Sequence, residues 1–281
     1  RAVAAAAAAD VAVVMVGTND EWETEGFDRT TMDLPGRQNE LVRRVVAANP
    51  RTAVIVNAGS PVTMDWADAA DANSARAVLT SFFAGQEQAE SLVDVLLGVA
   101  DPGGRLPTTI PVRLADHPAY LHHRPDHDSA GNGTQAYGEG LFIGYRGYDA
   151  RNIAPRFAFG HGLSYGSATW GEAVVTSESA DGITVEVRVA ATGSRVATVV
   201  VQGYIAAIDA PCIRPPKELK TWDKFVVEPG ASHVAQLEFP RSAFRRWDTA
   251  TGGWIVDAGD YELVIAASAT DIRQRLRVTL A

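Results

Sequence analysis

The sequence predicts an α/β domain followed by an all-β domain, and two patterns support this prediction. From residue 1 to about residue 110, strands that are apolar along their whole length alternate with amphipathic helices, as in a parallel sheet covered by helices on both faces. From about residue 168, short strands separated by Gly and Pro turns follow one another, as in a β-sandwich of about a hundred residues.

The α/β part begins with an Ala-rich helix that leads directly into a β-branched strand. A later helix is predicted because Leu41, Val42, Val45 and Val46 recur at helical spacing. In chain order, the predicted elements are a helix at 2–9, a strand at 11–16, a helix at 37–48, a strand at 52–57, a short helical piece around Trp66, a strand at 77–83 and a helix through EQAESLVDVLLG.

The middle of the chain, from about residue 101 to residue 167, is rich in Gly, Pro, His and Asp and has no clear periodicity. In the last part, stretches such as ITVEVRVAAT, TVVVQGYIA and HVAQLEFP alternate or run apolar over strand lengths. We therefore predict an α/β domain at 1–115, an irregular connecting segment packed on it at 116–167, and a β-sandwich at 168–281.

Composition excludes several classes of function. The 281 residues carry a net charge of −9 and a pI near 5.2, which disfavours a nucleic-acid partner. No apolar run approaches the roughly 20 residues that a membrane-spanning helix needs, so we expect no membrane partner. The single cysteine, Cys212, excludes an intrachain disulfide and a cysteine metal cluster.

The chain begins with RAVAAAAAADVAVVMVG, which is predicted to be a helix that runs into a buried strand. This stretch has no initiator Met and lacks the order of regions found in a signal peptide. We therefore expect the chain to be part of a longer protein, cytoplasmic or secreted, whose targeting signal would lie upstream.

Four acidic side chains lie within eight residues after the first predicted strand, in the stretch EWETEGFDRTTMDLP: Glu21, Glu23, Glu25 and Asp28. Parallel sheets bind ligands beyond the carboxyl ends of their strands, so this position favours a functional site. One carboxyl could act as general acid or base if Trp22 and Phe27 shield it from water. The pattern does not choose among the three glutamates, and it equally fits a polar loop that Asp33 caps before Pro35.

Residues 162–166, GLSYG, formally match the nucleophile-elbow pattern G-x-S-x-G of serine hydrolases. That chemistry needs a strand before Ser164 and a helix after it. Here a loop-like segment precedes the serine and a β domain follows, which disfavours a catalytic Ser164.

The segment DHPAYLHHRPDHD, residues 116–128, gathers four of the six histidines with three aspartates. It lacks the spacing of known zinc motifs, and its prolines indicate an extended surface loop. A solvated rim is therefore favoured over a metal site.

Several motifs, in the same order along the chain, resemble glycoside hydrolase family 3: TEGFDRTTMDLPGRQNELV, PGGRLPTTIP, YGEGLFIGYRGYD and FAFGHGLSYG. The later run RPPKELKTWDKFVVEPGAS resembles the fibronectin type III-like domain that closes many members. The resemblance covers essentially the whole chain. It implies that residues 1–115 are part of a largely parallel α/β sandwich domain, whose start is absent, and that a fibronectin type III-like β-sandwich follows.

The resemblance also implies the C-terminal portion of a retaining β-glycosidase, of which β-glucosidase is the expected type. In the family, an N-terminal (β/α)8 barrel carries an Asp nucleophile, and the α/β sandwich domain supplies the acid/base. That acid/base is the Glu before Gly in loops of this kind, which is Glu25 here. Asp28 and Arg29 match the motif and are expected to pair and hold the loop, with Trp22 as a further supporting residue.

The implied mechanism hydrolyses terminal β-linked sugars with two carboxyl groups about 5–5.5 Å apart, one as nucleophile and the other first as acid and then as base. It needs no metal or organic cofactor. The expected partners are a β-glycoside substrate and the barrel, as a domain or a separate chain. Without the barrel this chain is expected to be inactive. The alternative function is a non-catalytic carbohydrate-binding or association subunit.

Overall fold

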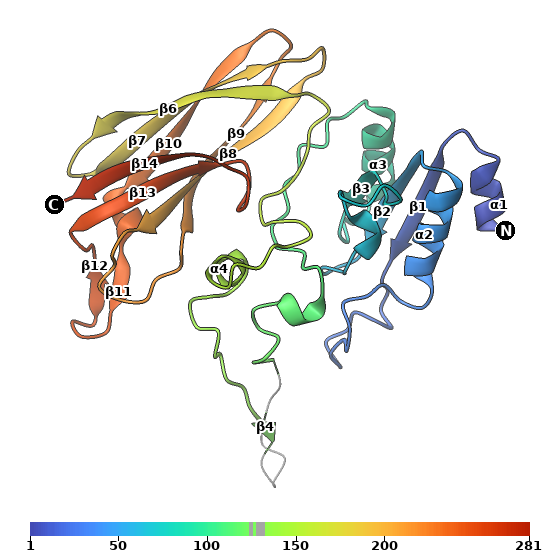
Figure 1. The fold of residues 1–281 in the computed structure, drawn as a ribbon, viewed down its shortest axis with the longest axis horizontal. Coiled ribbons are helices and arrows are strands. Elements are labelled where there is room, and N and C mark those ends of the chain that lie inside the picture. The colour runs from blue at the N-terminus through green and yellow to red at the C-terminus, as the bar shows by residue number, and fades with distance from the viewer. Residues whose placement is uncertain (124–125, 128–132) are drawn as a thin grey trace.

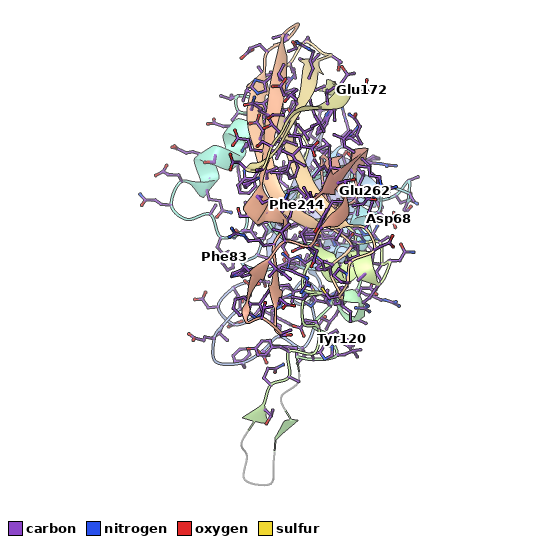
Figure 2. The ribbon with its side chains drawn as sticks, turned by 90° about the vertical axis from the view of Figure 1, so that its left-hand side faces the viewer. Asp68, Phe83, Tyr120, Glu172, Phe244 and Glu262 are labelled. Carbon is purple, nitrogen blue, oxygen red and sulfur yellow. The ribbon has the colours of Figure 1, made fainter. Side chains whose placement is uncertain are left out.

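The computed structural model describes residues 1–123, 126–127 and 133–281. An α/β unit occupies the N-terminal end of the molecule and an antiparallel β-sandwich the C-terminal end, with an irregular segment between them (Figure 1). Tyr120 lies towards the end that carries the short strands β4 and β5, and Glu172 towards the opposite end (Figure 2). The predicted order of α/β and then all-β structure is confirmed.

The α/β unit is built on a parallel sheet in the order β1-β2-β3. Its strands are β1 (Ala12–Gly17), β2 (Thr52–Asn57) and β3 (Ala77–Thr80). Its helices are α1 (Ala2–Ala7), α2 (Gln38–Ala48), the short η1 (Asp65–Ala67) and α3 (Gln88–Leu97). Each element lies within two residues of its predicted bounds, except that β3 ends at residue 80 rather than at 83.

Helices cover only one face of β1. Ala6 of α1 and Val42, Val45 and Val46 of α2 form a core with Val14 of β1. The alternate residues Val11, Val13 and Met15 are 59%, 55% and 58% exposed. The expected cover on both faces is therefore wrong for this strand. Helix α3 likewise has no buried residue.

Where the structure describes it, the connecting segment contains short elements: η2 (Leu114–Asp116), β4 (Asp126–His127), β5 (Gly133–Thr134) and α4 (Tyr145–Ala150). Ile110 and Phe157 pair through backbone hydrogen bonds, and both pack in the core of the α/β unit. Domain boundaries at residues 115 and 167 stay a prediction.

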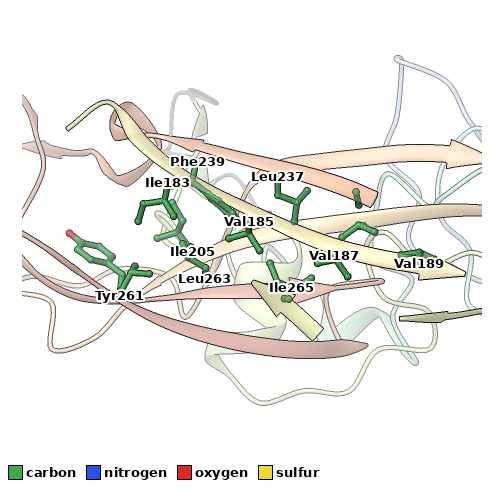
Figure 3. Close-up of a cluster of buried hydrophobic side chains, with 14 of the residues drawn as sticks. Ile183, Val185, Val187, Val189, Ile205, Leu237, Phe239, Tyr261, Leu263 and Ile265 are labelled. Atoms are coloured by element: carbon green, nitrogen blue, oxygen red, sulfur yellow. The ribbon is translucent and has the colours of Figure 1, made fainter. Parts of the chain in front are cut away.

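The β-sandwich consists of two antiparallel sheets with the strand orders β10-β7-β6 and β14-β13-β8-β9. The first contains β6 (Ala168–Glu178), β7 (Gly182–Ala191) and β10 (Ser232–Pro240), and the second β8 (Ala197–Ala207), β9 (Glu218–Val227), β13 (Gly259–Ala266) and β14 (Ile272–Leu280). Val185, Val187 and Leu237 of the first sheet meet Ile205, Leu263 and Ile265 of the second in a buried hydrophobic core (Figure 3).

After β10, the turn η3 (Arg241–Phe244) leads into a small hairpin of β11 (Arg246–Asp248) and β12 (Gly253–Ile255). In β7 and β10 every second side chain is buried in the core. This alternation produces the apolar–polar pattern from which the sequence predicts the β-sandwich. In the described part of the chain, no helix has both the length and the apolar character required to cross a bilayer.

Candidate active site

Three loops meet at the carboxyl edge of the parallel sheet, one after each strand. The loop after β1 lies at the lower end of the sheet in Figure 1. At its base the Gln38 side chain accepts a hydrogen bond from Gly17 N and donates one to Gly17 O, both at 2.8 Å. Gln88 of α3 donates to Asn57 Oδ1 at 2.7 Å and to Ser81 Oγ at 2.8 Å, which ties the ends of β2 and β3 together.

Glu23 anchors the loop after β1 to the end of β2. Its carboxylate accepts hydrogen bonds from Gly59 N at 2.8 Å, Ser60 N at 3.2 Å and Ser60 Oγ at 2.6 Å. Arg29 Nη1 adds an ion pair at 3.0 Å. The Glu23 side chain is only 14% exposed. Both carboxylate oxygens are therefore engaged in holding the loop.

The expected pairing of Asp28 with Arg29 is wrong. Arg29 turns inward to Glu23 and Ser60, and its side chain is 13% exposed. Asp28 points outward, 81% exposed, and its carboxylate lies 3.5 Å from His123 Nε2. Burial explains the difference, because an inward guanidinium needs an inward acceptor and Glu23 supplies it.

Two hydrogen-bond donors of the Arg29 side chain are unsatisfied within the described residues. Its Nε and Nη2 atoms are buried and have no hydrogen-bond partner among the residues that the structure describes. Buried donors without partners are costly, typically about 1–3 kcal/mol each. Because these donors are shielded from solvent, this cost accompanies holding Arg29 inward against Glu23.

Glu25 lies at the tip of a tight turn. Thr24 and Phe27 form an isolated antiparallel bridge, so that Glu25 and Gly26 are the two residues between them. Glu25 is exposed, and within the described ranges its carboxylate takes part in no ion pair. Phe27 is 59% exposed and Trp22 half-buried, so the expected apolar wall is open to solvent in this structure.

Asp33 has a different role from the expected cap. Its carboxylate accepts a hydrogen bond from the Thr63 hydroxyl, and Thr63 N donates to Met32 O at 2.8 Å. Helix α2 begins at Gln38 without a side-chain cap. Asp33 therefore fastens the far end of the loop to the segment after β2, as Glu23 fastens the near end.

Ser164 connects the middle of the chain to the β-sandwich. Its Oγ donates to Asp101 at 2.9 Å and accepts from Thr198 N at 3.0 Å, which connects residues 101 and 164 to strand β8. Burial raises the pKa of Asp101, but hydrogen bonds from Thr198, Tyr165 and Ser164 outweigh it and hold that pKa below its usual value. The segment is followed by strand β6 rather than by a helix, so the context of a nucleophile elbow is missing.

The His- and Asp-rich segment lies partly outside the described residues, since positions 124–125 and 128–132 are not described. Within the described part, no group of three His, Cys, Asp or Glu side chains is placed to hold a metal ion. His117 is half-buried, and this burial lowers the pKa of its ring. His123 faces Asp28 at the rim of the loop.

Comparison with known families gives two matches. A model described as the glycosyl hydrolase family 3 C-terminal domain matches residues 1–145. A model of the fibronectin type III-like domain matches residues 199–269. Together they span both the parallel sheet with its acidic loop and the strands β8, β9 and β13.

Among similar proteins, a beta-glucosidase of Rhizobium radiobacter is 41% identical over 281 residues, which cover 99% of this chain and 34% of the relative. Thermostable beta-glucosidase B of Acetivibrio thermocellus is 36% identical, with 95% of this chain and 35% of the relative covered. This chain thus spans about a third of the length of these relatives.

Solved structures agree with these matches. Beta-glucosidase from Kluyveromyces marxianus in complex with glucose superposes with a TM-score of 0.90 at 35% identity, covering 100% of this chain and 33% of that one. A GH3 beta-glucosidase of Bifidobacterium adolescentis gives a TM-score of 0.90 at 33% identity, covering 99% of this chain and 40% of that one.

The Glu23 anchor leads to a testable prediction. Glu23→Gln removes the negative partner of the buried Arg29 and should cost about 1–3 kcal/mol of local stability. We expect the amide protons of Gly59 and Ser60 to exchange at least about tenfold faster in hydrogen-exchange measurements. Glu21→Gln, in the same loop but exposed, is the matched control. If the amide protons of Gly59 and Ser60 exchange at the same rate in both variants, Glu23 does not anchor the loop.

Proposed function

The chain belongs to glycosyl hydrolase family 3, and we propose that it is the C-terminal portion of a retaining β-glycosidase in which Glu25 is the general acid/base. One observation carries the residue assignment. Of the glutamates after β1, Glu23 is committed to anchoring, whereas Glu25, at the tip of the anchored turn, has no ion-pair partner among the described residues. The similar proteins named as beta-glucosidases support a terminal β-linked glucose as the substrate.

A general acid needs a proton to give and room to reach the substrate. Glu23 has neither, because its oxygens accept four hydrogen bonds, including one from a cationic arginine. Glu21 is also exposed but precedes the anchor and lies outside the bridged turn. Geometry and the family pattern therefore favour the same residue.

The proposed reaction takes place in two steps. Glu25 donates its proton to the glycosidic oxygen while an Asp carboxylate attacks the anomeric carbon, which breaks the bond to the leaving group and forms a glycosyl ester. Glu25, now ionised, then takes a proton from water, whose oxygen displaces the Asp. The nucleophilic Asp is expected on the (β/α)8 barrel, so this chain alone should not hydrolyse glycosides.

Trp22, Asp28 and Arg29 have supporting roles in this proposal. Arg29 is a positioning residue that acts through Glu23. Asp28 and Trp22 border the loop on its solvent side and would be covered when the barrel is present.

The uncovered face of β1 supports a partner of this kind. Beside Val13 and Met15 lies a groove of about 410 Å³ lined by alanines of α1 together with Leu41 and Val45. Strand β1 is also the edge of its sheet. Exposed apolar edge strands are aggregation hazards, so proteins usually cover them. We propose that the barrel-bearing portion, which makes up most of the relatives' length, covers this face.

The acid/base assignment predicts the behaviour of Glu25→Gln in the complete enzyme, meaning this chain joined to its barrel. Turnover of glucosides with poor leaving groups should fall by about 10²–10⁴-fold, because proton donation is lost. Activated aryl glucosides should be affected less, and azide should restore part of their rate by attacking the glycosyl ester. Steady-state kinetics and detection of glucosyl azide measure both effects. Full turnover by Glu25→Gln would transfer the role to Glu21.

The partner surface predicts an effect of Met15→Glu. Because Met15 is exposed in this chain, the substitution should change the free energy of unfolding of the isolated 281 residues by no more than about 0.5 kcal/mol. The complete enzyme should lose stability, because a charge would be buried against the barrel portion. Val226→Glu, at a position 57% exposed on β9, is the control. Thermal unfolding of the isolated chain and of the complete enzyme measures both effects. If Met15→Glu and Val226→Glu destabilise the complete enzyme equally, the proposal that the barrel-bearing portion covers this face is wrong.

The alternative function, a carbohydrate-binding subunit, has one observation in its favour. Trp247 and Trp254 oppose each other on the β11–β12 hairpin, 51% and 64% exposed, with ring centroids 5.6 Å apart. Arg246 braces this hairpin through Asp248 and Asp257. If this function is correct, Trp254→Ala should reduce co-sedimentation with insoluble β-glucan, whereas Trp222→Ala should not.

A further inference from the structure

Phe82 has the most unusual backbone of the described chain. Among the described residues, three non-glycines have positive φ: Phe82 at 53°, Asn152 at 53° and Asp209 at 54°. Asn and Asp adopt this left-handed conformation readily, whereas a bulky aromatic residue does so only under constraint. Backbone strain of this kind concentrates at functional sites, and Phe82 lies two residues after the end of β3, at the edge that carries Glu23 and Glu25.

The strained turn places the next side chain, Phe83, across the end of β2. A methyl group added to Gly59 would lie 2.8 Å from Phe83 Cε2 and 2.4 Å from Glu23 Oε2. The Phe83 ring therefore rests on the bare Cα of Gly59, beside the carboxylate that anchors the catalytic turn. Even so, Phe83 is 52% exposed. The turn holds the ring at the surface rather than burying it.

The frame around this ring is rigid. Gln88 fixes Ser81 and Asn57 on either side of the β2–β3 junction, and Gly59 N is bound by Glu23. Phe27 is also exposed, but it lies on the turn of Glu25 itself. A fixed, exposed and purely apolar ring is suited to contact a ligand through its face, with little loss of side-chain entropy on binding.

We propose that Phe83 is a specificity-determining residue that stacks against the leaving group of the glycoside. This inference rests on the proposed function. A general acid protonates the oxygen between the sugar and its leaving group, so the leaving group must lie beside Glu25. A phenyl ring has no hydrogen-bonding group. Phe83 thus favours leaving groups with a flat apolar face, such as an aryl ring or the C–H face of a pyranose, over leaving groups that have none.

The test compares kcat/KM of the complete enzyme for three substrates: phenyl β-glucoside, cellobiose and β-glucosyl fluoride. Phe83→Ala should lose about tenfold on the first two and little on the fluoride, whose leaving group has no face to stack. Phe83→Trp should recover most of the loss, because it restores a planar ring. Phe83→Leu, which keeps apolar bulk without a flat ring, should behave like Phe83→Ala and replaces it if the alanine variant folds poorly.

Trp222→Ala, an exposed aromatic truncation on β9, is the control and should change none of the three values. An equal loss on all three substrates in Phe83→Ala would overturn the proposal, because the ring would then act only on the shape of the loop. Unchanged selectivity would overturn it as well. Failure of the proposed function is separate, since it would be seen as full turnover by Glu25→Gln whatever Phe83 does.

Discussion

The carboxylate of Glu23 is the interaction on which the candidate site depends. One side chain gathers two backbone N–H groups, a hydroxyl and a guanidinium, and so joins the loop after β1 to the turn after β2. A carboxylate used in this way cannot also exchange protons with a substrate. The anchor therefore also determines which neighbouring glutamate is free, and it supports the Gly59 surface on which Phe83 rests.

The rest of the α/β unit is arranged around an incomplete surface. One face of β1 packs on α1 and α2, while the other presents Val13 and Met15 to solvent. Arg29 keeps two buried donors without described partners. Both features carry a free-energy cost in the chain alone, the first from exposed apolar area and the second from desolvation. A partner that covers the exposed apolar face would relieve the first cost, which is why we propose that the barrel-bearing portion lies there.

Polar side chains connect the β-sandwich to the rest of the described chain. Ser164 and Asp101 connect the middle of the chain to β8. Lys217 of the segment before β9 pairs with Asp149 of α4, and its ammonium lies over the rings of Tyr145 and Tyr204. Burial raises the pKa of Asp149, and Lys217 opposes that shift. Motifs that are unusual in sequence, such as FGHGLSYG, thus serve packing rather than chemistry.

The sequence by itself determined the elements and their order. Buried apolar residues recur every second residue in strands and about every 3.6 residues in helices, and a short stretch of sequence is enough to show either pattern. It also located the acidic loop, since strand ends are readable from composition. Only the tertiary structure decided what each loop residue does. Arg29 pairs with Glu23, six residues away, rather than with its neighbour Asp28, and Glu23 also depends on Gly59 and Ser60, which are more than thirty residues distant. Contacts between separate strand ends are set by the packing of the sheet, and no local pattern encodes them.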